Sequence, residues 1–115
     1  MITLYGIRNC DTVRKARRWL EDHGIEYRFH DYRESGIERA RLDRWRQQTG
    51  CGKLLNRRSA TWRGLDADER ARAEDDEGCL QLLLAHPTLI RRPVVEYSGG
   101  LLVGFDPNRW AEALA

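Results

Sequence analysis

The sequence of 115 residues contains no apolar run long enough to cross a bilayer, which takes about 20 residues in a helix. Its first residues lack the pattern of a secretory signal peptide. Cysteine is scarce, with three widely spaced residues, and an odd, scattered set disfavours the disulfide framework of small secreted domains. These absences lead us to expect a cytoplasmic protein, and the length of 115 residues fits one domain.

Lysine is almost missing, since Lys15 and Lys53 are the only two. Arginine supplies nearly all the positive charge, and its planar fork suits carboxylates and oxyanions, although a compositional bias of the source genome explains the excess equally well. The net charge is only +2, with acids and bases interleaved. A dedicated nucleic-acid surface usually needs a concentrated basic face, so we expect neither nucleic acid nor membrane as a partner.

Metal and phosphate motifs are also absent. His23, His30 and His86 are not spaced with the cysteines as zinc ligands, so no metal site is expected. No glycine-rich phosphate loop is present. We therefore expect no tightly bound cofactor.

Hydrophobic periodicity predicts a strand, a helix and a strand, then a helical middle, then a hairpin and a last helix. The expected strands are a short one near 2–7, then 25–31, 94–97 and 101–105. The expected helices are one that follows a cap at Asp11 or Thr12 and ends at His23-Gly24, then 37–48, a small one that follows a cap at Asp66 and runs to about 73, then 77–85 and 107 to about 114. Because a short crossover favours parallel strands, this order predicts a thioredoxin-like α/β domain over 1–115. It has a mixed four-stranded sheet and a helical insertion at about 37–85.

Cys10 stands where the first strand has ended and the first helix begins. The positive end of a helix dipole stabilises an anion, so a cysteine there holds more of the nucleophilic thiolate. In open α/β sheets the ligand crevice lies beyond the carboxyl ends of the strands. Cys10 is thus a candidate nucleophile, the alternative being a small buried core residue. Asp11 or Thr12 is expected to cap the helix.

Four segments carry a resemblance to a known family. The sequence resembles the arsenate reductase-related family, which includes the glutaredoxin-linked arsenate reductases, the Spx regulators and the YffB proteins, and it is most similar to the YffB type. The segments are Tyr5-Gly6-Ile7-Arg8-Asn9-Cys10-Asp11-Thr12, Leu54-Leu55-Asn56-Arg57-Arg58, His86-Pro87-Thr88-Leu89-Ile90-Arg91-Arg92-Pro93 and Gly104-Phe105.

The resemblance implies roles for particular residues. It implies that Cys10 is the nucleophile, that Arg92 faces its thiol and that Pro93 is a cis proline. A guanidinium near the sulfur stabilises thiolate and can hold a substrate carboxylate or oxyanion. The alternatives are an ordinary surface arginine and a trans proline that starts a strand.

The sequence departs from the family pattern at several positions. The arsenate reductases have three arginines around the cysteine, whereas Asn56 stands in the first place and about Gly104 in the third. Losing charge-assisted contacts of about 1.5–3 kcal/mol each would weaken the binding of an oxyanion, unless Arg57 or Arg58 supplies the missing charge. Spx proteins have a second cysteine where this chain has Val13, so no local Cys-x-x-Cys switch exists.

The other two cysteines have weaker roles. Cys51 is either structural or a resolving thiol for Cys10, if it comes within disulfide distance. Cys79 lies among leucines and is expected in the core.

We therefore expect a glutathione-dependent thiol–disulfide reductase, with glutathione as co-substrate and a disulfide, oxyanion or protein disulfide as the second substrate. The alternatives are an arsenate reductase linked to glutaredoxin and a non-catalytic, Spx-like regulator that binds a protein partner. The expected catalytic residues are Cys10 and Arg92. The expected substrate-binding residues are Arg8, Asn9, Arg14, Asn56, Arg57, Arg58 and Pro93.

Overall fold

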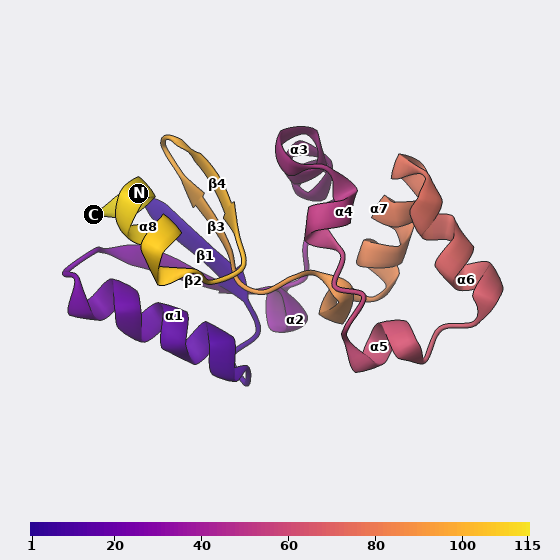
Figure 1. Ribbon diagram of the computed structural model, residues 1–115, viewed down its shortest axis with the longest axis horizontal. Coiled ribbons are helices and arrows are strands. Elements are labelled where there is room, and N and C mark those ends of the chain that lie inside the picture. Colours follow the sequence, from indigo (N-terminus) through magenta and orange to yellow (C-terminus); the bar gives the residue numbers. More distant parts are fainter. The chain divides into compact units, whose positions relative to one another are not determined.

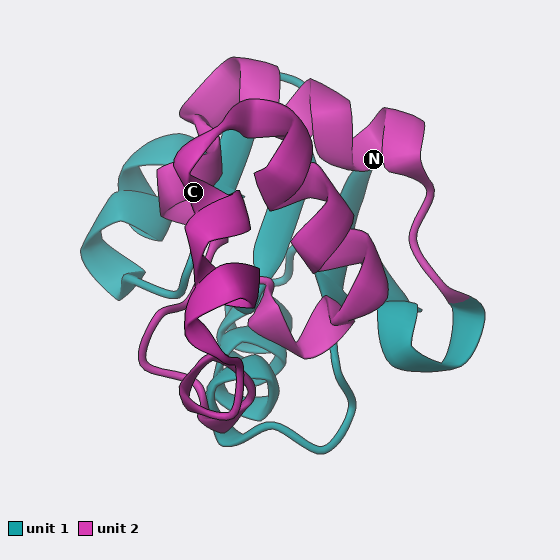
Figure 2. Cartoon of the chain, turned by 90° about the vertical axis from the view of Figure 1, so that its right-hand side faces the viewer, with its two compact units in different colours: residues 1–35, 92–115 teal, residues 36–91 magenta.

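The computed structural model describes all residues from 1 to 115 and divides into two compact units. The first unit combines Met1–Ser35 with Arg92–Ala115, and the second is the intervening segment Gly36–Arg91. Figure 2 shows the first unit in teal and the second in magenta. No helix in the structure has the length and apolar character needed to span a membrane.

The first unit contains a four-stranded sheet in the order β2-β1-β3-β4 (Figure 1). Strand β1 pairs parallel with β2, antiparallel with β3, and β3 pairs antiparallel with β4. This mixed sheet confirms the predicted fold class. The elements are β1 (Ile2–Gly6), α1 (Asp11–Asp22), β2 (Tyr27–Asp31), α2 (Tyr32–Ser35), β3 (Val94–Tyr97), β4 (Gly100–Val103) and α8 (Pro107–Leu114).

The core of the first unit forms on one face of this sheet. Leu4, Val95 and Leu102 stand opposite one another on neighbouring strands. Helix α1 covers them with an apolar stripe at helical spacing, and Trp110 of α8 completes the cluster, with its ring nearly perpendicular to that of Trp19 and the two ring centroids 5.8 Å apart. Burial of such stripes contributes about 25 cal/mol per Å² of apolar surface removed from water. The stripe on α1 is Val13, Ala16 and Leu20.

Gly6 brings strand and helix together just before Cys10. A methyl group on Gly6 would lie 2.9 Å from a methyl carbon of the buried Val13 side chain, closer than van der Waals contact permits. The missing side chain therefore lets the first turn of α1 pack directly on the end of β1. This packing fixes the start of the helix on which Cys10 lies.

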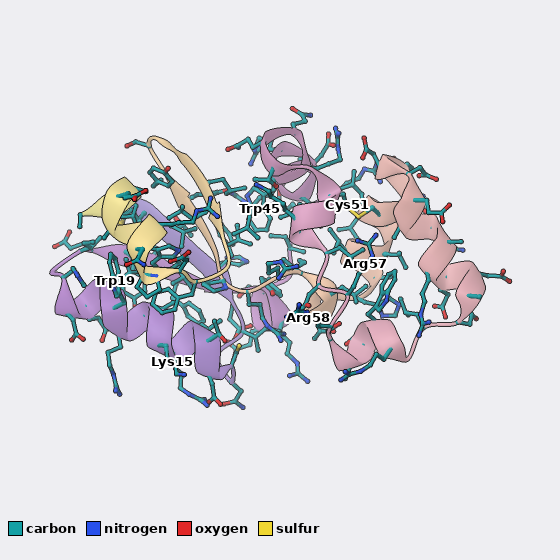
Figure 3. All side chains as sticks on the ribbon, viewed as in Figure 1. Lys15, Trp19, Trp45, Cys51, Arg57 and Arg58 are labelled. Carbon is teal, nitrogen blue, oxygen red and sulfur yellow. A yellow bond between two sulfur atoms is a disulfide. The ribbon has the colours of Figure 1, made fainter.

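The second unit is helical. Its elements are α3 (Arg39–Thr49), α4 (Cys51–Leu54), α5 (Ala60–Arg63), α6 (Ala67–Ala71), η1 (Arg72–Glu74), α7 (Asp76–Ala85) and η2 (Pro87–Leu89). Trp45, labelled in Figure 3, is fully buried, as are Leu54 of α4 and Leu83 of α7. Asp66 begins α6 with a reciprocal capping box to Glu69, and Asp75 caps α7 through the Gly78 amide. The helices near 66–73 and 77–85 agree with the sequence prediction.

Some local structure was predicted wrongly or not at all. The residue at the start of α1 is Cys10 itself, so neither Asp11 nor Thr12 caps the helix. Tyr32–Ser35 forms a single helical turn, α2, that the sequence analysis does not predict. Two further single turns, α4 and α5, are also not predicted.

Candidate active site

Cys10 lies at the N-terminal end of α1 with an extended backbone, φ −135° and ψ 125°. Its carbonyl accepts the first helical hydrogen bond, from the Arg14 amide at 2.9 Å. Its side chain makes no capping hydrogen bond. The residue is half-buried at the edge of the core and is the only free cysteine. Its thiol is therefore placed beside the unpaired amides of a helix start and is not sealed among apolar side chains.

The loop that leads to Cys10 is tied to the end of β2 by the Asp31 carboxylate. Asp31 is only 6% exposed. One carboxylate oxygen accepts from the Arg8 backbone amide at 2.9 Å. The other accepts from the backbone amides of Arg33 at 2.9 Å and Glu34 at 3.1 Å. Burial alone would raise the pKa of Asp31, but the three amide hydrogen bonds and the charge of Arg8 hold that pKa below its ordinary value.

We expect Asp31→Asn to destabilise the protein by about 1–3 kcal/mol at neutral pH, because the new amide group turns one acceptor into a donor that faces a backbone N–H. A lowered pKa contributes stability that is present above the ordinary Asp value of 3.8 and is lost as pH falls below it. Denaturant unfolding at several pH values measures this. The difference from wild type should shrink below about pH 4, whereas the exposed control Asp22→Asn should show no such trend. A constant difference would contradict this account.

Arg8 and Asn9 lie on the loop before Cys10 and line an open hollow of about 290 Å³ with Ile7, Asp31, Arg33 and Glu34. The Arg8 guanidinium lies 5.3 Å from the Phe29 ring centroid and 3.6 Å from the Glu34 carboxylate. Exposed ion pairs of this kind contribute about 1 kcal/mol at most. An anionic ligand can therefore compete with Glu34 for Arg8.

Arg14 pairs with Asp11 across one helical turn. The Asp11 carboxylate, expected to cap α1, instead neutralises part of the Arg14 charge. This corrects the capping prediction, and the physical reason is position: Asp11 is already the first helical residue, whereas a capping side chain belongs to the residue before it.

Arg92 and Pro93 come next to this loop through the sheet register. Strand β3 runs antiparallel to β1 with Val94 opposite Tyr5, so the residues before β3 lie at the carboxyl end of β1. The Arg92–Pro93 peptide bond is cis. Pro93 is buried, and its carbonyl accepts from the Gly104 amide at 2.8 Å. The first unit thus collects Arg8, Asn9, Cys10 and the Arg92–Pro93 pair at one end of its sheet.

Tyr32 is a site residue that the sequence analysis missed. It is 1% exposed, and its burial raises the pKa of its hydroxyl. The charge of the Arg92 guanidinium favours the ionised hydroxyl and partly offsets this rise in pKa, while the charges of Cys10 and Asp31 oppose ionisation. The hydroxyl therefore lies within electrostatic reach of both Cys10 and Arg92. The available signal was its place just beyond the end of β2, because β1 and β2 are parallel and end at the same edge.

The three remaining predicted residues belong to the second unit. The backbone N–H of Asn56 donates to the Leu89 carbonyl at 2.8 Å, and the side-chain oxygen of Asn56 accepts from the backbone N–H of Arg58 at 3.0 Å. This local bond is typical of asparagine at turns. The Arg57 guanidinium lies 5.4 Å from the Trp62 ring centroid, and Figure 3 labels Arg57 and Arg58.

Cys51 and Cys79 form a disulfide between α4 and α7, with their Cα atoms 6.5 Å apart. Cys79 is buried, as expected, but its bond to Cys51 was not predicted. Cys51 begins α4 and is not in a loop. In the disulfide state neither cysteine has a free thiol. No group of three or more histidine, cysteine or acidic side chains is placed to hold a metal ion.

Comparison with known proteins agrees with this geometry. A model of the ArsC family matches residues 5–113. A solved structure named YFFB protein is 46% identical over the full length of both chains, with a TM-score of 0.93. An arsenate reductase (ArsC) related protein from Brucella melitensis is 47% identical, covers 98% of this chain and 92% of its own, and has a TM-score of 0.77. The global transcriptional regulator Spx of Streptococcus pyogenes serotype M3 is 29% identical over 110 residues, which are 94% of this chain and 81% of Spx.

Proposed function

The chain belongs to the ArsC family, and from this premise we propose that it is a glutathione-dependent thiol–disulfide reductase with Cys10 as its nucleophile. One observation supports the proposal above all: the only free thiol is half-buried at the start of α1, beside the loop tied by Asp31. A reductase with a single reactive thiol needs a second thiol from outside. Glutathione is the abundant thiol of the cytoplasm, where we place the reaction.

The proposed cycle has two exchanges. The Cys10 thiolate attacks the glutathione sulfur of a mixed disulfide, R–S–S–G, so that a Cys10–glutathione disulfide forms and the R thiolate leaves and takes up a proton. A glutathione thiolate then attacks the glutathione sulfur on Cys10, which releases oxidised glutathione and the Cys10 thiolate. The sum is RSSG + GSH → RSH + GSSG.

The surrounding residues receive roles from their placement. Arg92, whose charge acts on the Tyr32 hydroxyl, stabilises the negative sulfur. Arg8 and Asn9 line the hollow beside the cysteine loop and suit the carboxylates of glutathione. Pro93 is a buried residue just before β3, beside Arg92, and is proposed to contact the substrate. Arg14, Asn56, Arg57 and Arg58 stay candidate substrate contacts.

Incubation with oxidised glutathione, followed by intact mass measurement and peptide mapping, tests the proposal. We expect one glutathione adduct, on Cys10, that added glutathione removes. A coupled assay with glutathione and the mixed disulfide of glutathione and a small uncharged thiol then measures turnover. Absence of both the adduct and the turnover would overturn the proposal.

Arsenate is the second candidate substrate, since arsenate reductase-related proteins of known structure share the fold. In the arsenate reductase pattern that the sequence resembles, Asn56 and about Gly104 stand in the places of two arginines, and the loss of their charge-assisted hydrogen bonds weakens binding of an oxyanion. The same coupled assay with arsenate in place of the disulfide separates the two activities. Binding of a protein partner without turnover would instead favour a regulator of the Spx type.

Arg92→Ala should slow alkylation of Cys10 by neutral iodoacetamide at pH 7 by about tenfold, as expected for loss of one nearby opposite charge. Arg92→Lys should restore part of the rate. The matched control is Arg91→Ala, because Arg91 is exposed and its side chain donates to the Lys53 carbonyl in the second unit. Equal alkylation rates for wild type and Arg92→Ala would refute the role of Arg92.

A further inference from the structure

Helix α1, which begins directly after Cys10, has its positive charges gathered on its exposed surface in its first two turns. Arg14, Lys15 and Arg18 are exposed there, and Arg17 is half-buried. The acidic residues of the helix stand at its two ends, Asp11 in the first turn and Glu21 and Asp22 in the last. Figure 3 shows Lys15 extending from α1 away from the sheet.

Two of the four cations already have partners. Arg14 pairs with Asp11. Arg17 donates to the Tyr27 hydroxyl at 2.9 Å and lies 4.1 Å from the Phe29 ring centroid. Lys15 and Arg18 make no hydrogen bond, ion pair or ring contact. Their charges are therefore available to a ligand.

Helix stability does not explain this distribution. The N-terminal end of a helix carries the positive end of the dipole, so cations are favoured in the last turn and disfavoured in the first. Here the last turn has no basic residue, while Arg14 and Lys15 stand within the first five residues of α1. The ion pair with Asp11 accounts for Arg14, but neither the dipole nor an ion pair accounts for Lys15 and Arg18, so their placement favours a role in binding.

The spacing along α1 matches an extended peptide. Arg14 and Lys15 lie four and five residues after Cys10, or about 6–7.5 Å along the helix axis, and Arg18 lies about 12 Å away. Two residues of an extended chain span about 6.6 Å and four span about 13 Å. One open hollow of about 220 Å³ is lined by Asp11 and by three basic residues of α1. We call these three residues, Arg14, Lys15 and Arg18, the basic stripe.

We propose that the substrate is a polypeptide cysteine joined to glutathione, with acidic residues two and four positions from that cysteine, and that these residues bind the basic stripe. The inference rests on the reductase function proposed above and names its substrate class. The Cys10 thiolate attacks the glutathione sulfur, and the polypeptide thiolate leaves while its acidic side chains lie along α1. Lys15 and Arg18 are specificity-determining residues with no part in the exchange itself.

The test compares three substrates in the coupled glutathione assay. The first is a glutathionylated peptide with glutamate two and four residues to either side of its cysteine. The second is the same peptide with glutamine at those four positions. The third is the mixed disulfide of glutathione with a small uncharged thiol. We expect kcat/KM to be about tenfold higher for the acidic peptide than for the neutral one. At about 1 M salt, where the Debye length is about 3 Å, the advantage should vanish.

The double variant Lys15→Glu/Arg18→Glu should bring the ratio of acidic to neutral kcat/KM to one or below. Lys15→Gln/Arg18→Gln provides a second variant should charge reversal impair folding, which circular dichroism reports. The matched control is Arg109→Glu, an exposed arginine on α8, which should leave the ratio unchanged.

Each other outcome has a distinct meaning. A wild-type ratio near one, or a ratio that the double variant leaves unchanged, would overturn the basic stripe as a binding surface while the reductase function stands. Failure of all three substrates, the small uncharged one included, would overturn the reductase function and this proposal with it.

Discussion

Cys10→Ser is expected to lower turnover of glutathione mixed disulfides by about a thousandfold or more, the scale seen when a catalytic nucleophile is removed. A serine hydroxyl has nearly the same size but does not ionise near neutral pH, so it neither attacks a disulfide nor holds glutathione. The coupled assay measures the turnover, and intact mass measurement should show no glutathione adduct.

The fold should survive this change. The Cys10 side chain makes no capping hydrogen bond and is half-buried, so the midpoint of thermal unfolding should move by only a few degrees. Thr12→Ala, an exposed position at the same helix end, is the control and should keep full turnover. Turnover that persists in Cys10→Ser would show that the nucleophile lies elsewhere.

Gly78→Ala should have the largest effect on stability. A methyl group on Gly78 would overlap the Arg72 carbonyl oxygen and lie 2.9 Å from its carbonyl carbon. Both atoms are backbone, so η1 or α7 must shift, and the shift strains the Asp75 cap on the Gly78 amide. Overpacking costs about 1–3 kcal/mol and occasionally more, which predicts a fall of about 10 °C in the unfolding midpoint.

Gly52→Ala is the matched control, a second glycine in a helix of the same unit. No atom lies within 4 Å of the methyl group it would add, and alanine is favoured over glycine in helices by about 1 kcal/mol. Differential scanning calorimetry should therefore show a slightly higher midpoint for Gly52→Ala. Equal midpoints for Gly78→Ala and wild type would contradict the assigned backbone contact.

Periodicity and end signals were enough to predict the elements of the sheet and the longer helices. The alternation of Tyr27 and Phe29, the Ser98-Gly99-Gly100 turn and the Asp106-Pro107 start of α8 all correspond to observed elements. The single turns α2, α4 and α5 were not predicted, because four residues are too few to show a helical period.

The sequence predicts a site residue only where the order of elements along the chain marks its position. Cys10 is marked by the change from strand to helix. Tyr32 is marked only by its place beyond the end of β2, and its relation to Arg92 depends as well on the register between β1 and β3. The three backbone amide partners of Asp31 are not predicted by any local sequence pattern. The Cys51–Cys79 disulfide joins residues 28 positions apart, and sequence alone does not determine which cysteines pair.

The division of the first unit between two chain segments has a consequence for biosynthesis. Strand β3, the antiparallel neighbour of β1, begins only at Val94. Most of the polypeptide is therefore synthesised before this partner of β1 emerges from the ribosome. Contacts between residues so distant in sequence slow folding. We therefore expect the contiguous second unit to acquire structure first on the nascent chain, with the sheet closing last.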